Sequence, residues 1–429
     1  MSTDVTRAGD DVAVEDDELR GAPADLDDGD LNDDLNDLDT GELETRRRPE
    51  WTSRRVGALL APALIYLGVR EFGLLVLTWM AGVNHYSVSL ALLAWDGRWL
   101  LGIAEGGYDH VPEGLVDAQG GRSGTTPMAF FPGYPMVVRF LSDLDGPGGI
   151  GLVTAAITVT IVCGVLCAYG LARLGRQVRG GSTRAGLVLV ALFAATPMAI
   201  VLSMAYSEAM FCALAVWALV GVLERRWLLA GMSCALAGLV RPTAAALILA
   251  VGLAVVLALV ERRDDWRPWV AGLVAPLGLL GYLGWVGARM NNLAGWFEVQ
   301  QTGWRTRFDG GLATWRWASD VLANPQYPYE VLTVGLILVA LALTVVCVVR
   351  RLEWPLLVYG IGVLLMDLAS NGLMNSKVRL MVPAFTLLIP VAIALAKRRT
   401  STMLITLGAL VVASSWFGAY AITTWSYAI

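Results

Sequence analysis

Histidine and cysteine are scarce in this chain of 429 residues. There are two histidines and five cysteines, and every cysteine stands inside an apolar run. The cysteines form no CxxC pair and no spacing typical of a disulfide framework. A His/Cys zinc site is therefore not expected, and we expect neither a metal nor a cofactor.

Charge is also scarce, and it is unevenly placed. Charged residues make up 16% of the chain and hydrophobic ones 56%, whereas soluble domains carry about 25% charged residues. Residues 1–44 hold 17 acidic residues and two arginines, a net charge of −15, and because the whole chain carries −5, the remainder carries +10. A basic body suits anionic lipid head groups. We expect membrane lipids as partners and no nucleic acid.

The first 45 residues are predicted to be a disordered acidic tail in the cytoplasm. Isolated leucines between aspartates cannot bury enough apolar surface to offset the entropy of ordering. The segment also lacks the basic and apolar regions of a signal peptide. A solvating tail and an interaction site for a partner are both open, and residues 46–429 are expected to form the membrane domain.

Apolar runs predict about eleven transmembrane helices, because a helix needs about 20 apolar residues to cross the hydrocarbon core. The predicted spans are 56–80, 149–172, 186–204, 207–223, 228–240, 243–260, 269–288, 331–349, 355–371, 380–396 and 402–424. The fold class is thus an all-α, multi-pass bundle in the cell membrane.

Clusters of Lys and Arg predict the orientation of the bundle. With eleven spans, the clusters at 46–55, 173–184, 225–226, 262–267, 350–351 and 397–399 all fall on the side of the N-terminus. Cytoplasmic loops carry this excess of positive charge, so the N-terminus is predicted inside and the C-terminus outside. Two long loops, about 82–147 and 289–330, then lie on the outer face, where long loops carry function.

The first outer loop contains the sequence AWDGRW at 94–99. Apolar residues at helical spacing over 90–103 predict an amphipathic helix in the outer interface. Asp96 would then lie beside Trp95 at the membrane surface, where a carboxylate can accept a proton from a sugar hydroxyl as general base. The alternative is an aspartate that only caps a short interfacial helix.

Four further segments carry candidate site residues. The run AFFPGYP at 129–135 has prolines that exclude ordinary helix interior, and it predicts a rigid re-entry into the second span or an aromatic belt. The second outer loop offers Gln301, Trp304 and Asp309 for sugar rings and hydroxyls, or it is an interfacial loop anchored by tryptophans. Last, Arg241, Lys377 and Arg379 are cations on the outer side. They either reach out to the head groups or bind an anionic ligand such as a lipid phosphate.

In combination these segments resemble the PIG-V mannosyltransferase family of GT-C glycosyltransferases. The resemblance covers the chain from about residue 56, through the motifs at 95–108 and 130–139 and the segments AYSEAMF (205–211) and AGLVRPT (237–243). The matched residues are Trp95, Asp96, Ile103, Ala104, Gly107, Tyr108, Phe130, Phe131, Pro132, Tyr134, Pro135 and Arg139. The sequence departs from eukaryotic members in lacking a histidine after the Trp-Asp pair, and it is closer to a bacterial, actinobacterial branch.

The resemblance implies a GT-C-like bundle that transfers mannose from a polyprenyl-phosphate donor to a glycan, glycolipid or protein acceptor, with inversion. It makes Asp96 the base and gives the donor phosphate to Arg241 with Arg379 or Lys377. Sugar or acceptor contacts would come from Glu105, Tyr108, Glu208, Gln301, Trp304 and Asp309. A transporter or lipid flippase is the alternative, although few charges lie within the spans, and a membrane scaffold is a third reading.

Overall fold

The computed structural model describes residues 53–429, apart from 145, 147–148, 263, 426 and 428–429. The predicted acidic tail lies outside these residues. The described chain is helical, and its one strand-like contact is an isolated antiparallel bridge between Phe308 and Ser370. An all-α fold, predicted from the apolar runs, is confirmed.

Six helices are long and apolar enough to cross a membrane. They are α1 (Ser53–Val83), α5 (Leu152–Gln177), α9 (Ala244–Glu261), the α10–α11 unit (Arg267–Val274 and Leu277–Met290), α14 (Pro328–Val349) and α18 (Thr400–Thr423). A bent pair would make a seventh span: η3 and α16 (Met374–Ser376 and Lys377–Leu380) meet η4 and α17 (Phe385–Leu388 and Ile389–Ala396) at 65°. These helices indicate a multi-pass membrane protein.

Four shorter apolar helices lie among the long ones. They are α6 (Thr183–Ala194), α7 (Glu208–Leu223), α8 (Trp227–Gly238) and α15 (Trp354–Leu368). Each coincides with a predicted span, but each has fewer residues than the roughly 20 needed to cross the hydrocarbon core unaided. The count of eleven spans therefore stays a prediction.

Prolines interrupt two of the predicted spans. The run 186–204 forms α6, which ends before Pro197, followed by a short 3-10 helix η2 (Ala199–Leu202). The run 269–288 is divided into α10 and α11 at Pro276, the N-cap residue of α11. Proline has no backbone N–H and its ring collides with the preceding turn, so a helix breaks or bends there.

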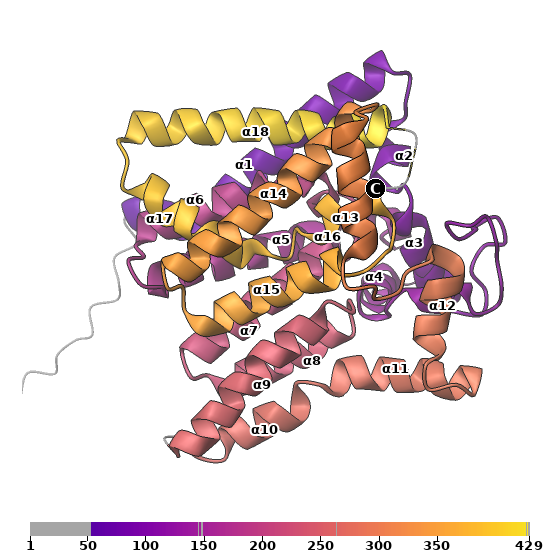
Figure 1. Cartoon of the computed structure of the whole chain (residues 1–429), viewed down its shortest axis with the longest axis horizontal. Coiled ribbons are helices and arrows are strands. Elements are labelled where there is room, and N and C mark those ends of the chain that lie inside the picture. The colour runs from indigo at the N-terminus through magenta and orange to yellow at the C-terminus, as the bar shows by residue number, and fades with distance from the viewer. Residues whose placement is uncertain (1–52, 145, 147–148, 263, 426, 428–429) are drawn as a thin grey trace, which may run out of the picture. The chain divides into compact units, whose positions relative to one another are not determined.

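Both predicted outer loops contain helices of their own. The first holds α2 (Val88–Leu92), α3 (Asp96–Gly106), η1 (Thr126–Ala129) and α4 (Gly133–Asp143), and the second holds α12 (Gly295–Trp304) and α13 (Leu312–Ala323). In Figure 1, α2, α3, α12 and α13 gather at the right-hand end of the bundle, while the turns α9–α10, α14–α15 and α17–α18 lie at the left-hand end.

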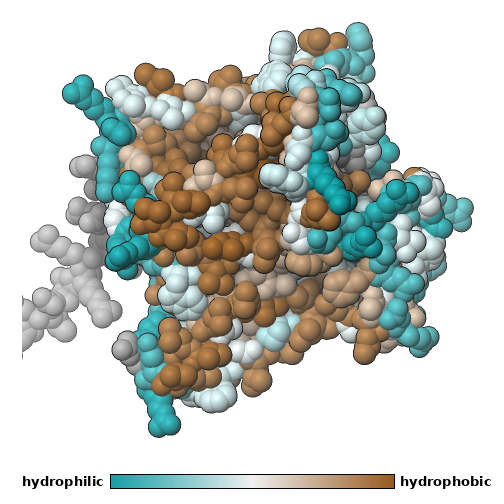
Figure 2. Space-filling model, in the orientation of Figure 1, coloured by the Kyte–Doolittle hydropathy of each residue, from teal (hydrophilic) through white to brown (hydrophobic). Residues whose placement is uncertain are grey.

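The arginine-rich turns are joined to one another at their end of the bundle. Arg173 at the end of α5 donates to the Glu224 carboxylate in the α7–α8 turn, with Nη2 to Oε2 at 2.7 Å. The backbone N–H of Arg179 donates to Glu353 Oε1 before α15 at 2.6 Å. Figure 2 shows a broad hydrophobic band across the middle of this face, with hydrophilic side chains at both ends. This pattern is typical of a bundle that spans a bilayer.

Candidate functional site

A cavity of about 900 Å³ is lined by residues of α3, α12, α15 and α16, together with the segment before α7 and the α8–α9 turn. Five charged residues that the sequence singles out line it: Asp96, Glu208, Arg241, Lys377 and Arg379. These residues are spread over more than 280 positions of the chain, so the fold brings the acids and the cations together.

Asp96 is the first residue of α3 and follows a strained turn. The turn divides the single helix predicted over 90–103 into α2 and α3. Trp95 has φ +55°, a backbone region in which bulky residues are outliers and which clusters at functional sites. The Tyr206 hydroxyl holds the turn by donating to the carbonyl of Ala94 at 3.0 Å. As a result, Asp96 lines the cavity.

Asp96 forms an ion pair with Arg379. Arg379 Nη1 lies 2.7 Å from Asp96 Oδ2, and the guanidinium lies over the Tyr206 ring at 5.4 Å from its centroid. The Arg379 side chain is 9% exposed and that of Asp96 is 26% exposed. The carboxylate is thus accessible while the guanidinium is largely enclosed, and a ligand in the cavity can reach both.

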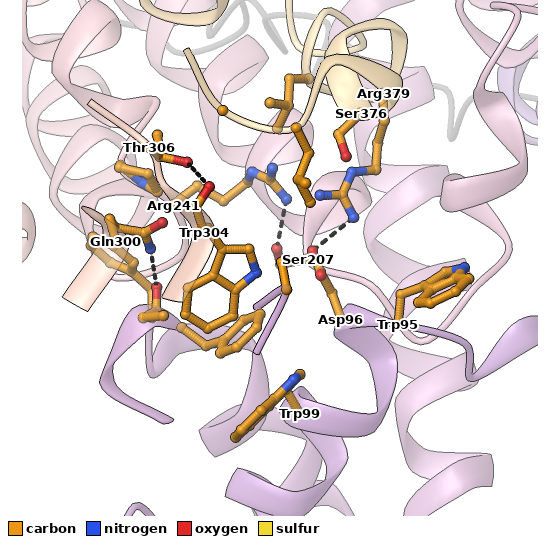
Figure 3. Close-up of a pocket in the computed structure, with 18 of the residues that line it drawn as sticks. Trp95, Asp96, Trp99, Ser207, Arg241, Gln300, Trp304, Thr306, Ser376 and Arg379 are labelled. Atoms are coloured by element: carbon orange, nitrogen blue, oxygen red, sulfur yellow. Dashed lines mark hydrogen bonds and ion pairs between the residues drawn. The ribbon is translucent and has the colours of Figure 1, made fainter. Parts of the chain in front are cut away.

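Glu208, the first residue of α7, joins this pair to a second arginine. The Glu208 side chain has no exposed surface. Its Oε1 atom lies 2.8 Å from Arg241 Nη1 and 3.8 Å from Arg379 Nε. Arg241 Nη1 also donates to Ser207 Oγ at 3.0 Å. Figure 3 shows the two guanidinium groups pointing toward one another above Ser207 and Asp96. Two carboxylates and two guanidinium groups make this cluster neutral.

Both arginines keep donors that the protein does not use. Among the described residues, Nε of Arg241 and Nε of Arg379 are buried without a hydrogen-bond acceptor, and both oxygens of the neighbouring Glu208 carboxylate are buried without a donor. A buried donor without an acceptor is unfavourable by about 1–3 kcal/mol. An anion with several oxygen atoms, such as a phosphate, supplies acceptors for paired guanidinium groups.

Lys377 has a different environment from the arginines. Its Nζ donates to the carbonyls of Asp367 at 2.6 Å and Ser370 at 2.7 Å, and it lies 3.8 Å from the Asp367 carboxylate. The side chain is 1% exposed. The ammonium group therefore ties α16 to the C-terminal end of α15, where cations stabilise unpaired carbonyls. Two of its three donors are thus used by backbone carbonyls.

Aromatic side chains also line the cavity, and in Figure 3 Trp99 and Trp304 lie below the two guanidinium groups. Trp99 stacks on Phe130 at 5.5 Å, and Trp304 meets Phe130 edge to face at 5.6 Å. Trp296, Gln300 and Trp304 line the cavity at a spacing of four residues, which puts them on one face of α12. Gln301, the predicted residue, is exposed and does not line the cavity, whereas Gln300 donates to the carbonyl of Ala129 at 3.1 Å.

Three other predicted contact residues do not line the cavity either. Glu105 is exposed on α3. The Tyr108 hydroxyl donates to the carbonyl of Phe130 at 2.8 Å, and burial raises its pKa. Asp309 accepts hydrogen bonds from the backbone N–H groups of Ala313 at 2.8 Å and Gly311 at 2.9 Å. These bonds cap α13 and hold the pKa of the Asp309 carboxyl below its ordinary value.

The segment 129–135 forms the joint between the first outer loop and the bundle. The Gly133 N–H donates to the carbonyl of Leu239 at 2.7 Å, two residues before Arg241. A Cβ at Gly133 would lie 2.8 Å from that carbonyl oxygen, so only glycine permits this approach. The loop is thereby held against the α8–α9 turn that carries Arg241.

The predicted motif residues around Gly133 serve this joint in different ways. Phe131 lines the cavity and packs on Tyr282, with ring centroids 4.4 Å apart. Pro132 is the N-cap residue of α4 and Pro135 lies in its first turn, where proline is tolerated. The Tyr134 hydroxyl donates to the carbonyl of Ala156 at 2.9 Å. Arg139 is exposed on α4, away from the cavity, and lies 3.7 Å from Asp143.

One wall of the cavity is apolar. It is formed by α9, α11, α15 and the residues next to Arg241, and it carries Val240, Leu279, Leu283, Val363 and Met366. The same cavity thus has a charged end and a hydrocarbon wall. A ligand that fits both has an anionic group attached to an apolar chain.

Sequence reasoning missed several lining residues, including Arg98, Ser207, Gln300, Thr306 and Ser376. The spacing of Trp296, Gln300 and Trp304 was a usable signal for Gln300. Ser207 and Ser376 each adjoin a predicted residue, but nothing local separates them from ordinary serines near a helix start.

Searches against protein-family models and against curated proteins return no match for this chain. Within the described part of the chain, no group of three or more His, Cys, Asp or Glu residues is placed to hold a metal ion. The chemistry that the site offers by its own side chains is proton acceptance by Asp96 and anion binding by Arg241 and Arg379.

Proposed function

We propose that this protein is an integral membrane glycosyltransferase that transfers a hexose from a polyprenyl-phosphate sugar to an acceptor on the outer face, with inversion. The observation that carries the proposal is the combined character of one cavity. Its charged end holds a partly exposed carboxylate beside two arginines with unused donors, and its wall of Val, Leu and Met residues suits a hydrocarbon chain. Mannose as the sugar and a glycan, glycolipid or protein as the acceptor rest on the resemblance to the PIG-V family.

The proposed reaction exchanges two bonds at the anomeric carbon of the sugar. An acceptor hydroxyl attacks that carbon, its proton passes to Asp96, and the bond to the phosphate oxygen breaks. The leaving phosphate gains negative charge, which Arg241 and Arg379 stabilise through hydrogen bonds. Donor phosphate also competes with Asp96 for Arg379, so donor binding frees the carboxylate to act as the base.

Orientation in the membrane belongs to the same proposal. The six long helices, the bent pair and the four shorter apolar helices make eleven segments, which agrees with a cytoplasmic N-terminus and an outer C-terminus. The arginine-rich turns and the cavity-lining outer-loop helices lie at opposite ends of the bundle (Figure 1). The rule that cytoplasmic loops are rich in Lys and Arg then supports an outer position for the cavity, where cytoplasmic nucleotide sugars would not reach it.

The proposal is tested with purified protein in vesicles, incubated with labelled polyprenyl-phosphate mannose and, separately, with labelled GDP-mannose. We expect label to pass from the lipid donor to a hydroxyl acceptor and none to pass from the nucleotide sugar. Transfer from GDP-mannose alone would contradict the assignment of a polyprenyl-phosphate sugar as the donor. Movement of the intact lipid donor between leaflets without any transfer would favour a flippase instead.

A further inference from the structure

A second hollow of about 380 Å³ lies between the first outer loop and α12. Its lining includes Asp117, Arg122 and Ser123 from the loop, and Glu298, Thr302 and Trp304 from α12. Asp117 and Trp304 also line the main cavity. We call this hollow the polar groove. It adjoins the main cavity at those two residues, and its size falls in the range of roughly 300–1,000 Å³ typical of ligand sites.

The loop side of the polar groove is held in a fixed shape by its own hydrogen bonds. The Arg122 guanidinium donates to the carbonyls of Val111 at 2.6 Å and Leu115 at 3.1 Å. Asp117 Oδ1 accepts from the N–H groups of Gln119 at 2.8 Å and Gly121 at 2.9 Å. The groove wall is thus organised without a ligand, which reduces the entropy lost on binding.

The junction between the groove and the main cavity depends on a glycine. A Cβ at Gly303 would lie 3.2 Å from Asp117 Oδ2, closer than most side-chain contacts allow. Trp304, the next residue, presents its indole at this junction and is supported edge to face by Phe130. Aromatic faces pack well against the C–H faces of sugar rings, because both surfaces are apolar and flat.

The groove is lined by hydroxyl and carboxylate side chains together with the apolar Met290, Val299 and Trp304. One arginine against two carboxylates gives its lining residues a formal net charge of −1. Such a surface repels anions and offers hydrogen-bond acceptors to neutral hydroxyl groups. Among the described residues, the Thr302 hydroxyl makes no hydrogen bond to protein and is exposed on the groove side of α12.

These features assign the two hollows to different substrates, given the proposed glycosyl transfer. We infer that the polar groove binds the acceptor as a neutral chain of two or more sugar units. The terminal unit crosses Trp304 and brings its hydroxyl to Asp96, while the lipid donor occupies the apolar wall of the main cavity. The acceptor is then an existing glycan that the protein extends, whether or not that glycan is carried by a lipid.

The test blocks the groove without touching Asp96 or the arginines. Thr302→Trp puts an indole into the groove from an exposed position, and Leu293→Trp on the same outer loop adds an indole at a residue that is 91% exposed and lines neither hollow. Methyl α-mannoside, α-mannobiose and α-mannotriose serve as acceptors with labelled polyprenyl-phosphate mannose. In wild type we expect the acceptor KM to fall at least tenfold from the monosaccharide to mannotriose.

Thr302→Trp should lose this gain while its KM for methyl α-mannoside and for the donor stays as in wild type, and Leu293→Trp should keep the gain. A gain that survives in Thr302→Trp, or no gain in wild type, overturns the inference. If no acceptor receives sugar, the proposed function fails, and the groove is tested separately by saturation-transfer NMR of mannotriose. Binding lost only in Thr302→Trp then supports the groove, and equal binding in both variants overturns it.

Discussion

Glu208→Gln separates two roles that this residue could have. The sequence suggests a contact with sugar or acceptor, whereas the structure puts the carboxylate wholly inside the protein between Arg241 at 2.8 Å and Arg379 at 3.8 Å. Glutamine keeps the shape and one acceptor oxygen but removes the negative charge. The cluster of two acids and two arginines then changes from neutral to a net charge of +1.

The change in donor affinity follows from Coulomb's law. At an effective dielectric constant of about 20, a carboxylate about 6 Å from the donor phosphate disfavours its binding by about 3 kcal/mol. Relaxation of the arginines toward Asp96 reduces the gain, and we expect donor affinity to rise about tenfold, which corresponds to about 1.4 kcal/mol. Turnover should fall, because arginines that Glu208 no longer positions stabilise the leaving phosphate less well, by a factor of about 10–100.

The assay measures kcat and donor KM together with direct binding of the donor to protein in nanodiscs. Glu224→Gln is the matched control, because Glu224 pairs with Arg173 and Arg226 at the other end of the bundle. The control should lose stability without a change in donor affinity. Weaker donor binding in Glu208→Gln would refute the argument that removal of the negative charge strengthens binding of the donor phosphate.

Three further variants test neighbouring parts of the site. Arg241→Gln should raise donor KM about tenfold or more through the loss of a charge-assisted bond to phosphate, measured against an unchanged acceptor KM. Lys377→Met should lower the free energy of unfolding by about 3–5 kcal/mol, because it leaves the buried Asp367 carboxylate without its cation. The double variant with Asp367→Asn should recover part of the loss. Asp309→Asn should lower the melting temperature at pH 7. Because the folded-state pKa of Asp309 is lowered, this difference should vanish as the pH falls through that pKa.

Local sequence patterns predicted most of the helices. The run 243–260, for example, forms α9 over Ala244–Glu261. In lipid, a single apolar segment satisfies its backbone hydrogen bonds internally only as a helix. The breaks at Pro197 and Pro276 were also encoded locally, although hydropathy alone merged the segments on either side. Helix positions within the outer loops depended on tertiary contacts such as the Tyr206 hydrogen bond to Ala94.

The sequence predicted several residues of the candidate site, but it did not predict which of them contact one another. Asp96, Arg241 and Arg379 stood out as charges at membrane depth. Nothing local showed that Arg379 pairs with Asp96, 283 positions away, or that Lys377 points at backbone carbonyls. Pairings of this kind depend on how the helices pack, which a hydropathy pattern does not encode. For the same reason Gln301 stood out in the sequence, while the phase of α12 turns Gln300 to the cavity.

The most direct test of glycosyl transfer at this cavity is the rate of sugar transfer from labelled polyprenyl-phosphate mannose by Asp96→Asn. Asparagine keeps a hydrogen-bond acceptor for Arg379 but is not a general base, so we expect transfer to fall by about 10²–10⁴-fold with donor binding retained. Asp109→Asn, which alters a loop aspartate paired with Arg289 outside the cavity, should transfer sugar like wild type. Wild-type transfer by correctly inserted Asp96→Asn would contradict the assignment of Asp96 as the base.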